Sequence, residues 1–489
     1  MRTLCSVIAV LVFSSIISAE VAHSAGTVTL PSETVRDKIR GGLLGQIFAN
    51  LNGLKYENRH IHQPGNVTEY VPSLPDGAET DDDTDIEWVY ILAMQKHGLF
   101  VPYDILSNVW KRHINRYIWC SHQYVRHLLD LGVPTELTGS EILNPWAEFN
   151  IAGQFTCEMF GQMSPLMPRS GSLWATHYLR VIVDGEPLQT TQFFVTIIAS
   201  AFETDDIPRL VDAGLEAVDP QSNVYEIVRN TRKWCEENPD DWKATRKLIH
   251  DTYTKHQGRM RDYNGYELNT AATVAALIYG KGDYVETAIH AFNFGWDADN
   301  TAAAAGTVIG VIHGEKWFRK QGWDIKDVYK NTRRDEMPLD ETLTSFGDRL
   351  IELAEKRIVA QGGKINSGPN GDLYEIRVEK PANVLPLCVL KDQRTKLLKA
   401  SSEKLTEAFE GEPSPMTSAG SAYLAICLDI DKTLQERNPA RWNEWINALN
   451  HRQEFLKIIG GGQDVPTRAL FREKLRNAGV HFPATEKKP

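Results

Sequence analysis

Hydrophobic residues recur every three or four positions along most of the chain between residues 33 and 360. This spacing places them on one face of an α-helix, whereas the strict alternation expected of half-buried strands is rare here. The pattern predicts helices over residues 191–202, 271–279 and 284–294, among others, with short polar loops between them. We therefore expect residues 33–360 to form an all-α domain.

An almost entirely apolar segment, residues 86–94, follows the acidic run Asp81-Asp82-Asp83-Thr84. Such a segment predicts a buried helix. Acidic residues at a helix start cap free N–H groups and complement the helix dipole, and this role alone would explain the run. Three consecutive aspartates repel one another unless a cation lies between them, so a metal site is the alternative interpretation.

A second acidic cluster, Asp297 and Asp299, precedes an Ala- and Gly-rich segment, residues 300–312. Small residues recur there at every fourth position and give the predicted helix a smooth face for close packing. These residues are Ala302, Gly306, Gly310 and Gly314. A loop with a helix cap would explain this cluster too. Hard divalent cations prefer oxygen ligands, so the two clusters would suit such a cation if the fold joined them.

The composition changes at residues 361–371, which are rich in Gly, Asn and other turn-forming residues. We expect a linker here, at the start of a small C-terminal extension of mixed structure, residues 361–489. Its patterned segments are two short strands over residues 373–378 and 384–389 and two helices over residues 395–409 and 442–459. The sequence leaves open whether this extension is a separate domain or packs onto the first one.

The N-terminal segment has the features of a secretory signal. Arg2 precedes a mostly apolar stretch, residues 4–17, and small residues follow at Ala19 and Ala25, two candidate cleavage sites. The apolar stretch is shorter than the roughly 20 residues that span a bilayer, which disfavours a membrane anchor. We expect residues 1–25 to be removed and the mature chain to be exported, with no membrane association.

The 489-residue chain carries a formal net charge of −11, and its Lys and Arg residues are scattered. Nucleic-acid-binding proteins gather basic residues on the face that neutralises phosphates. The sequence holds no basic stripe of that kind, so we expect no nucleic-acid partner. The oligomeric state stays open.

Three segments, taken in order, resemble the motifs of one enzyme family. Residues 40–57 hold Arg-Gly-Gly-Leu-Leu-Gly and end in Glu57, residues 82–84 are Asp-Asp-Thr, and residues 295–306 join an acidic turn to an Ala-rich helix. Each motif alone is weak, but their order and spacing resemble the ADP-ribosylglycohydrolase family over residues 35–355.

The resemblance implies an orthogonal helical bundle that holds two Mg²⁺ ions, with Mn²⁺ as an alternative. It implies Glu57 and Asp83 as catalytic residues, with Glu57 contacting metal or taking a proton from the attacking water. The positions expected to bind metal are Asp81, Asp82, Asp83, Asp297, Asp299 and Asn300. Two metals would orient ribose hydroxyls and polarise a water for attack at the anomeric carbon.

The chain departs from the family motifs at several positions. Asn50 stands where the opening motif has Asp, Asp81 and Asn300 stand where Thr ligands are expected, and Trp296 replaces a Gly. A register that uses Thr80 in place of Asp81 stays open. Oxygen ligands persist at nearly all of these positions, so we expect metal binding to be retained. Asn50 and Trp296 are expected to line the substrate pocket, where such changes would alter substrate choice.

The leading hypothesis is an exported, magnesium-dependent hydrolase that cleaves an N- or O-glycosidic bond between ADP-ribose and an acceptor. ADP-ribosylation draws on NAD and is largely intracellular, so a glycoside hydrolase of the same fold with another sugar substrate is the first alternative. The second is a non-catalytic, crystallin-like binding protein. Five clustered acids argue against it, because a pure scaffold has no need of them.

Overall fold

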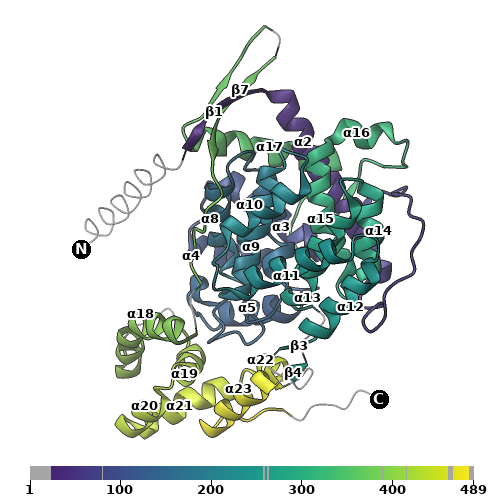
Figure 1. Ribbon diagram of the computed structural model, residues 1–489. Helices are drawn as coiled ribbons and strands as arrows, with labels where there is room; N and C mark the ends of the chain where they lie inside the picture. The colour runs from purple at the N-terminus through teal and green to yellow at the C-terminus, as the bar shows by residue number, and fades with distance from the viewer. Residues whose placement is uncertain are drawn as a thin grey trace.

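The computed structural model of the chain describes residues 24–79, 81–256, 259–260, 264–369, 371–387, 390–412, 414, 416–460 and 466–483. Helices form the body of the molecule, and the strands of the described residues make only small sheets (Figure 1). The predicted all-α class is therefore confirmed. Residues 1–23 of the predicted signal segment, and Thr80, lie outside the described residues.

The helices are α2 (Ser32–Gly53), η2 (Leu54–Tyr56), α3 (Asp82–His97), α4 (Tyr103–His113), α5 (Cys120–Asp130), η3 (Thr135–Leu137), α6 (Ala152–Phe155), α7 (Glu158–Gln162), α8 (Pro168–Leu179), α9 (Glu186–Ser200), α10 (Ile207–Ala217), α11 (Asn223–Glu237), α12 (Trp242–Tyr253), α13 (Tyr266–Gly280), α14 (Tyr284–Phe294), α15 (Ala298–His313), α16 (Glu315–Lys320), α17 (Leu343–Ala360), α18 (Leu390–Glu410), α19 (Ser418–Cys427), α20 (Asp431–Arg437), α21 (Pro439–Asn450), α22 (Gln453–Gly460) and α23 (Pro466–Asn477). The strands are β1 (Ser24–Pro31), β2 (Ala78–Glu79), β3 (Lys255–His256), β4 (Arg259–Met260), β5 (Tyr329–Lys330), β6 (Lys364–Asn366) and β7 (Leu373–Glu379).

Helices α9, α13 and α15 are buried along almost their whole length and lie at the centre of the bundle. Their apolar residues surround the helix axis, which is typical of a helix covered on every side. The predicted helices over residues 191–202, 271–279 and 284–294 correspond to α9, α13 and α14. These three predictions are confirmed, although α9 begins and ends earlier than expected.

Helices α2 and α15 cross at close range through glycines. A Cβ atom on Gly45 would collide with the carbonyl oxygen of Gly306, and one on Gly41 would collide with that of Gly310. The two helices therefore run antiparallel with their backbones in contact, which only residues without side chains permit. Further along, a Cβ on Gly53 would lie 2.7 Å from the Cα of Asp299. The end of α2 is thus fixed against the acidic start of α15.

A three-stranded antiparallel sheet, in the order β1-β7-β6, joins the two ends of the helical region. Val28 pairs with Ile376, and the amide of Ser32 donates to the carbonyl oxygen of Asp372 at 2.9 Å. The predicted strand over residues 373–378 is confirmed as β7. Strand β1 was not predicted, because its first residues were assigned to the signal segment.

The C-terminal helices α18 to α23 form a layer beside α5 (Figure 1). They share a second hydrophobic core with α5 and the loop that follows it. The hydroxyl of Tyr423 donates to the carbonyl oxygen of Leu143 at 2.6 Å, and the amide of Thr417 donates to that of Leu131 at 3.0 Å. The extension therefore packs onto the helical domain, which the sequence had left open.

Two details of the extension differ from prediction. The helix expected over residues 442–459 is divided into α21 and α22, because the chain turns at residues 451–452. The prediction of a strand over residues 384–389 is wrong for residues 384–387, which form a bend and irregular backbone between β7 and α18. Residues 388–389 lie outside the described part of the chain. None of the described helices combines the length and the apolarity needed to span a bilayer.

Candidate metal centre

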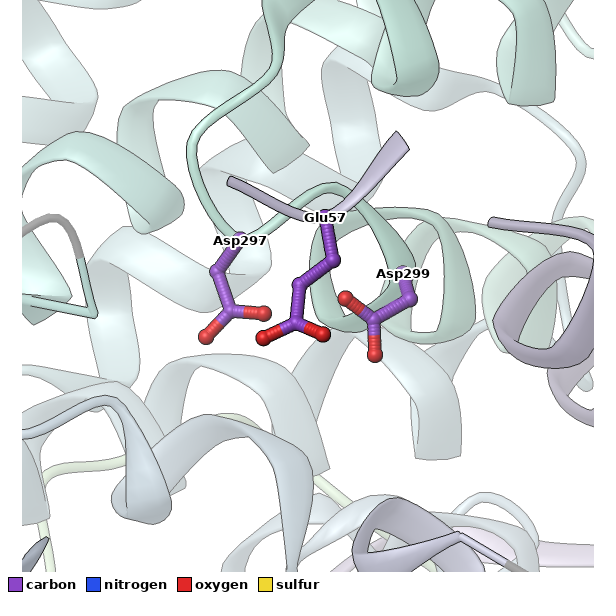
Figure 2. A group of neighbouring side chains, drawn as sticks. All are labelled: Glu57, Asp297 and Asp299. Atoms are coloured by element: carbon purple, nitrogen blue, oxygen red, sulfur yellow. The ribbon is translucent and has the colours of Figure 1, made fainter. Parts of the chain in front are cut away.

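Three carboxylates converge where α2 ends and α15 begins. Glu57 follows η2 directly, Asp297 is the N-cap residue of α15, and Asp299 lies in its first turn. One oxygen from each lies within 4.8 Å of the others, and Figure 2 shows the three carboxyl groups turned toward a common space. We call these residues the first carboxylate group. Opposite ligands of one bound ion lie about 4 to 5 Å apart, so the group suits a single divalent cation.

The loop that carries Glu57 is fixed to the turn before α15. The amide of Asn58 donates to the carbonyl oxygen of Trp296 at 2.8 Å, and the indole N–H of Trp296 donates to that of Ile61 at 3.1 Å. The Arg246 guanidinium lies over the indole, 4.5 Å from the ring centroid. Trp296 is completely buried, so it fixes these loops together and does not present an exposed wall to a substrate.

A second set of carboxylates lies on the other side of Asp299. Asp81 is the N-cap residue of α3, and Asp83 lies in its first turn. With Asp299 they form what we call the second carboxylate group, in which one oxygen from each residue again lies within 4.8 Å of the others. Asp83 is completely buried and the other two are nearly so. The fold therefore joins the two acidic clusters that the sequence identified.

Asn50 lies among the carboxylates of the second group. Its Nδ2 donates to Asp83 Oδ2 at 2.7 Å and lies 3.4 Å from an oxygen of both Asp81 and Asp299. The guanidinium of Arg333 also pairs with Asp81. Asn50 was predicted as a substrate-pocket residue, and the structure places it, fully buried, between acidic side chains.

The remaining predicted ligands are Asp82, which belongs to neither carboxylate group, and Asn300, which follows Asp299 in α15. Asp82 is half-buried, and burial followed by repulsion from Asp81 raises its pKa well above the usual range. Asn300 is nearly buried beside Asp299, and its Oδ1 has no hydrogen-bond partner among the described residues. Asn300 thus has a free acceptor near the acids.

Burial and mutual repulsion keep these acids from ionising at their usual pH. Burial, followed by repulsion from Glu57, raises the pKa of Asp297 to about 7. Burial and the neighbouring carboxylates raise the pKa of Asp83 and of Asp299 well above the usual range. Burial and then Asp81 raise the pKa of Glu57 in the same direction. A cation would relieve both effects, because an opposite charge favours the ionised form.

Two acceptor atoms in the cluster have no protein donor. Asp299 Oδ1 and Asp83 Oδ1 are buried and accept no hydrogen bond from the described residues. Buried oxygens without partners are rare and destabilising, and oxygen is the ligand atom that Mg²⁺ and Mn²⁺ prefer. Asp299 belongs to the first carboxylate group, so the donor set of that group fits the divalent cation that the sequence predicted, whereas Asp83 Oδ1 belongs to the second group alone.

Sequence reasoning missed the basic and amide residues around the acids. Arg333 reaches Asp81 because the parallel pairing of β2 with β5 brings residues 81 and 333 together just beyond its end. Asn264 donates to Asp297 Oδ2 at 2.7 Å. Neither residue stands in a patterned segment, so only long-range contacts identify them. Behind the site, Gln46, one turn before Asn50 in α2, donates at 3.0 Å to the buried Glu87, one turn after Asp83 in α3.

A cavity of about 720 Å³ lies elsewhere, lined by residues that include Phe100, Tyr103 and Leu385. It is mostly apolar and opens near the C-terminal end of α3. A helix of that length spans roughly 24 Å, so this cavity is far from the acidic N-terminal end. None of the described residues that line it is an Asp or a Glu.

The fold and this site together define a class: an all-helical protein in which three helix ends meet around a cluster of carboxylates that could hold a metal ion. The sequence model of the ADP-ribosylglycohydrolase family matches residues 31–360, more than half of the chain. The chain belongs to this family, which suggests a hydrolase and is typically metal-dependent. No curated protein matches the chain.

Proposed function

We propose that this chain is a magnesium-dependent glycohydrolase that cleaves an N- or O-glycosidic bond of ADP-ribose to an acceptor. The observation that carries the proposal is the first carboxylate group, in which Glu57, Asp297 and Asp299 converge within 4.8 Å. These three residues would hold the cation, with Mn²⁺ as an alternative to Mg²⁺. When bound, it would orient sugar hydroxyls and lower the pKa of a nearby water.

Glu57 is the best placed general base. It is partly exposed, whereas the four aspartates of the two groups are buried, so a water that attacks the substrate can reach it. Burial raises the pKa of Glu57, which strengthens it as a proton acceptor near neutral pH. As water bonds to the anomeric carbon, its proton passes to Glu57 and the acceptor departs with the electrons of the broken bond.

In their ionised form, the buried aspartates would contribute negative charge. Cleavage at an anomeric carbon passes through a cationic sugar, which nearby carboxylates stabilise. Asp83 is held by Asn50 at 2.7 Å and cannot turn away. We assign Asp83 to this electrostatic role and Glu57 to proton transfer.

Exposed aromatic residues flank the acids and support a substrate with flat or sugar rings. Tyr117 is 50% exposed and Trp119 is 57% exposed, with their ring centroids 6.3 Å apart. The Arg333 guanidinium lies 5.7 Å from the Tyr117 ring. Rings stack on such residues, and Arg binds phosphate. ADP-ribose offers both features.

The alternative is a glycoside hydrolase of the same fold that acts on a different sugar. The N-terminal segment supports it, because an exported enzyme would meet ADP-ribosylated proteins rarely. We also propose that the mature chain is exported and that it has no nucleic-acid partner. Aromatic platforms also bind sugars that carry no nucleotide.

An assay of the purified chain separates these candidates. ADP-ribosylated protein and a panel of glycosides would be incubated with Mg²⁺, with Mn²⁺ or with a chelator. We expect cation-dependent release of ADP-ribose, and a loss of both activity and cation affinity in Glu57→Gln, because Glu57 also belongs to the first carboxylate group. Activity on a glycoside alone would favour the alternative. Turnover of no substrate, with no cation bound, would refute both and leave a binding protein.

A further inference from the structure

Asn50 occupies the place where the second carboxylate group would bind an ion. From this we infer that the chain binds one divalent cation, in the first carboxylate group, and that Asn50 and Arg333 take the place of a second. The inference rests on the proposed function for the one cation only. It departs from the two-ion centre that the family resemblance implies.

The position of the Asn50 amide is the first argument. Its Nδ2 lies 2.7 to 3.4 Å from one oxygen of each residue in the second carboxylate group. An amide nitrogen is a donor and has no lone pair to offer a metal. A cation held by the same three oxygens would need the space that this nitrogen fills. The amide oxygen points elsewhere and has no hydrogen-bond partner among the described residues.

Charge is the second argument. Arg333 pairs with Asp81, whose side chain is only 4% exposed, and so supplies the positive charge that a metal would otherwise bring. Burying a carboxylate without such a partner is strongly unfavourable. A guanidinium and a second cation would repel each other across the same aspartate.

Arg333 is held in this place by its neighbour. Arg334 forms a fully buried ion pair with Asp85 at 2.9 Å and donates to the carbonyl oxygen of Tyr117 at 2.8 Å. The backbone at residue 333 is therefore anchored to α3 and to the segment before α5. The contacts of Arg334 thus fix the position of the Arg333 backbone, from which the Arg333 side chain reaches Asp81.

Among the described residues, the first carboxylate group has neither an amide nitrogen in contact with all three acids nor an arginine paired with one of them. None of the ion pairs formed by the described residues involves Glu57, Asp297 or Asp299. Asn58 and Asn264 each donate to a single one of its carboxylates, and Asn50 reaches only the shared Asp299, at 3.4 Å. The space among its three oxygens is thus left for an ion.

The test is the number of Mn²⁺ ions bound per full-length chain, from calorimetric titration and from metal analysis after gel filtration. The electron paramagnetic resonance spectrum gives a second readout, since two ions in one site couple magnetically and one does not. We expect one ion with the resolved hyperfine pattern of isolated Mn²⁺. Two coupled ions would overturn the inference; this would follow if Asn50 turned its oxygen inward as a ligand. No bound ion would overturn the proposed function itself.

Variants test which residues exclude the second ion. The double variant Asn50→Asp, Arg333→Gln should bind two ions and show the coupled spectrum. Asn52→Asp and Arg112→Gln make the same chemical changes away from the site, where Asn52 binds Ser73 and Arg112 pairs with exposed Glu336. These controls should bind one ion. A folded double variant that still binds one would overturn the assignment to Asn50 and Arg333. If it fails to fold, the wild-type stoichiometry still decides.

Single substitutions locate the bound ion. Asp83→Asn alters only the second carboxylate group and should leave one ion bound. Asp297→Asn alters only the first and should leave none. The opposite result would place the ion among Asp81, Asp83 and Asp299 and overturn the inference.

Discussion

The two carboxylate groups share Asp299 and have the same size, but their surroundings differ. The second group has partners within the protein, the Asn50 amide that donates to Asp83 and the Arg333 guanidinium that pairs with Asp81. Among the described residues, the first group has amide donors at its edge, Asn58 and Asn264, and a 3.4 Å contact from Asn50 to the shared Asp299. Similar clusters of acids can therefore be stabilised in two ways, by protein donors or by an ion. The neighbours of each acid decide which.

The largest expected effect comes from breaking the first group. Asp297→Asn should lower cation affinity and kcat/KM by more than about 100-fold, since even changes around metal ligands typically cost 10–100-fold. Calorimetry and steady-state kinetics would measure the two losses. The circular dichroism spectrum should stay helical, because asparagine preserves the shape of the N-cap residue. Unfolding of this variant would show that the acid serves structure first.

The helix contact that positions both groups gives the next effect. Gly45→Ala would drive a methyl group into the backbone of Gly306 and should lower the free energy of unfolding by about 1–3 kcal/mol. Chemical denaturation would measure it. Gly347→Ala is the matched control, because its Cβ would meet only the flexible side chain of Arg40 at 3.0 Å. Equal stability of the two variants would contradict the close packing of α2 on α15.

The pH dependence of stability tests whether the acids of the first carboxylate group lack a positively charged partner when no cation is bound. The pKa of Asp297 rises from 3.8 to about 7 in the folded chain without a cation. Its stabilising contribution is therefore full below pH 3.8 and is lost as the pH rises through 7. Without cation, the melting temperature should fall between pH 5 and pH 8, and Mg²⁺ should restore it at pH 8. The fall should be smaller in Asp297→Asn; an unchanged fall would exclude Asp297 as its source.

The smallest effect is expected at Asp82, the acid that belongs to neither group. Asp82→Asn should change kcat/KM by less than about twofold and lower the free energy of unfolding by no more than about 1 kcal/mol, the contribution of an acid to a helix dipole. The same assays apply, with Asp297→Asn as the contrasting variant. A loss as large as that of Asp297→Asn would show that Asp82 binds the ion after all.

Much of the fold could be predicted from local patterns. The positions of α9, α13 and α14 follow from helical periodicity, and the small residues along α15 indicated a close helix partner. Strand β1 could not be predicted, because its pairing with β7 joins residues more than three hundred positions apart. The docking of the extension on α5 is also a long-range contact that no local pattern reveals.

The site, like the fold, could be predicted where local sequence patterns indicate it and not where it depends on long-range contacts. Two acidic clusters at helix starts indicated that carboxylates would meet, and the motif order joined Glu57 to them. Which aspartate of the run faces inward depends on where α3 begins, so Asp82 could not be separated from its neighbours. Arg333 reaches the site through the short pairing of β2 with β5. Its role could not be predicted from the sequence around it.

The most direct test of the central claim is the anomalous diffraction of Mn²⁺ in crystals of the full chain soaked with the ion. One strong peak among the carboxylates of Glu57, Asp297 and Asp299 is predicted, with the Asn50 amide still bound to Asp83. A peak among Asp81, Asp83 and Asp299, or no peak at a concentration that supports activity, would contradict it.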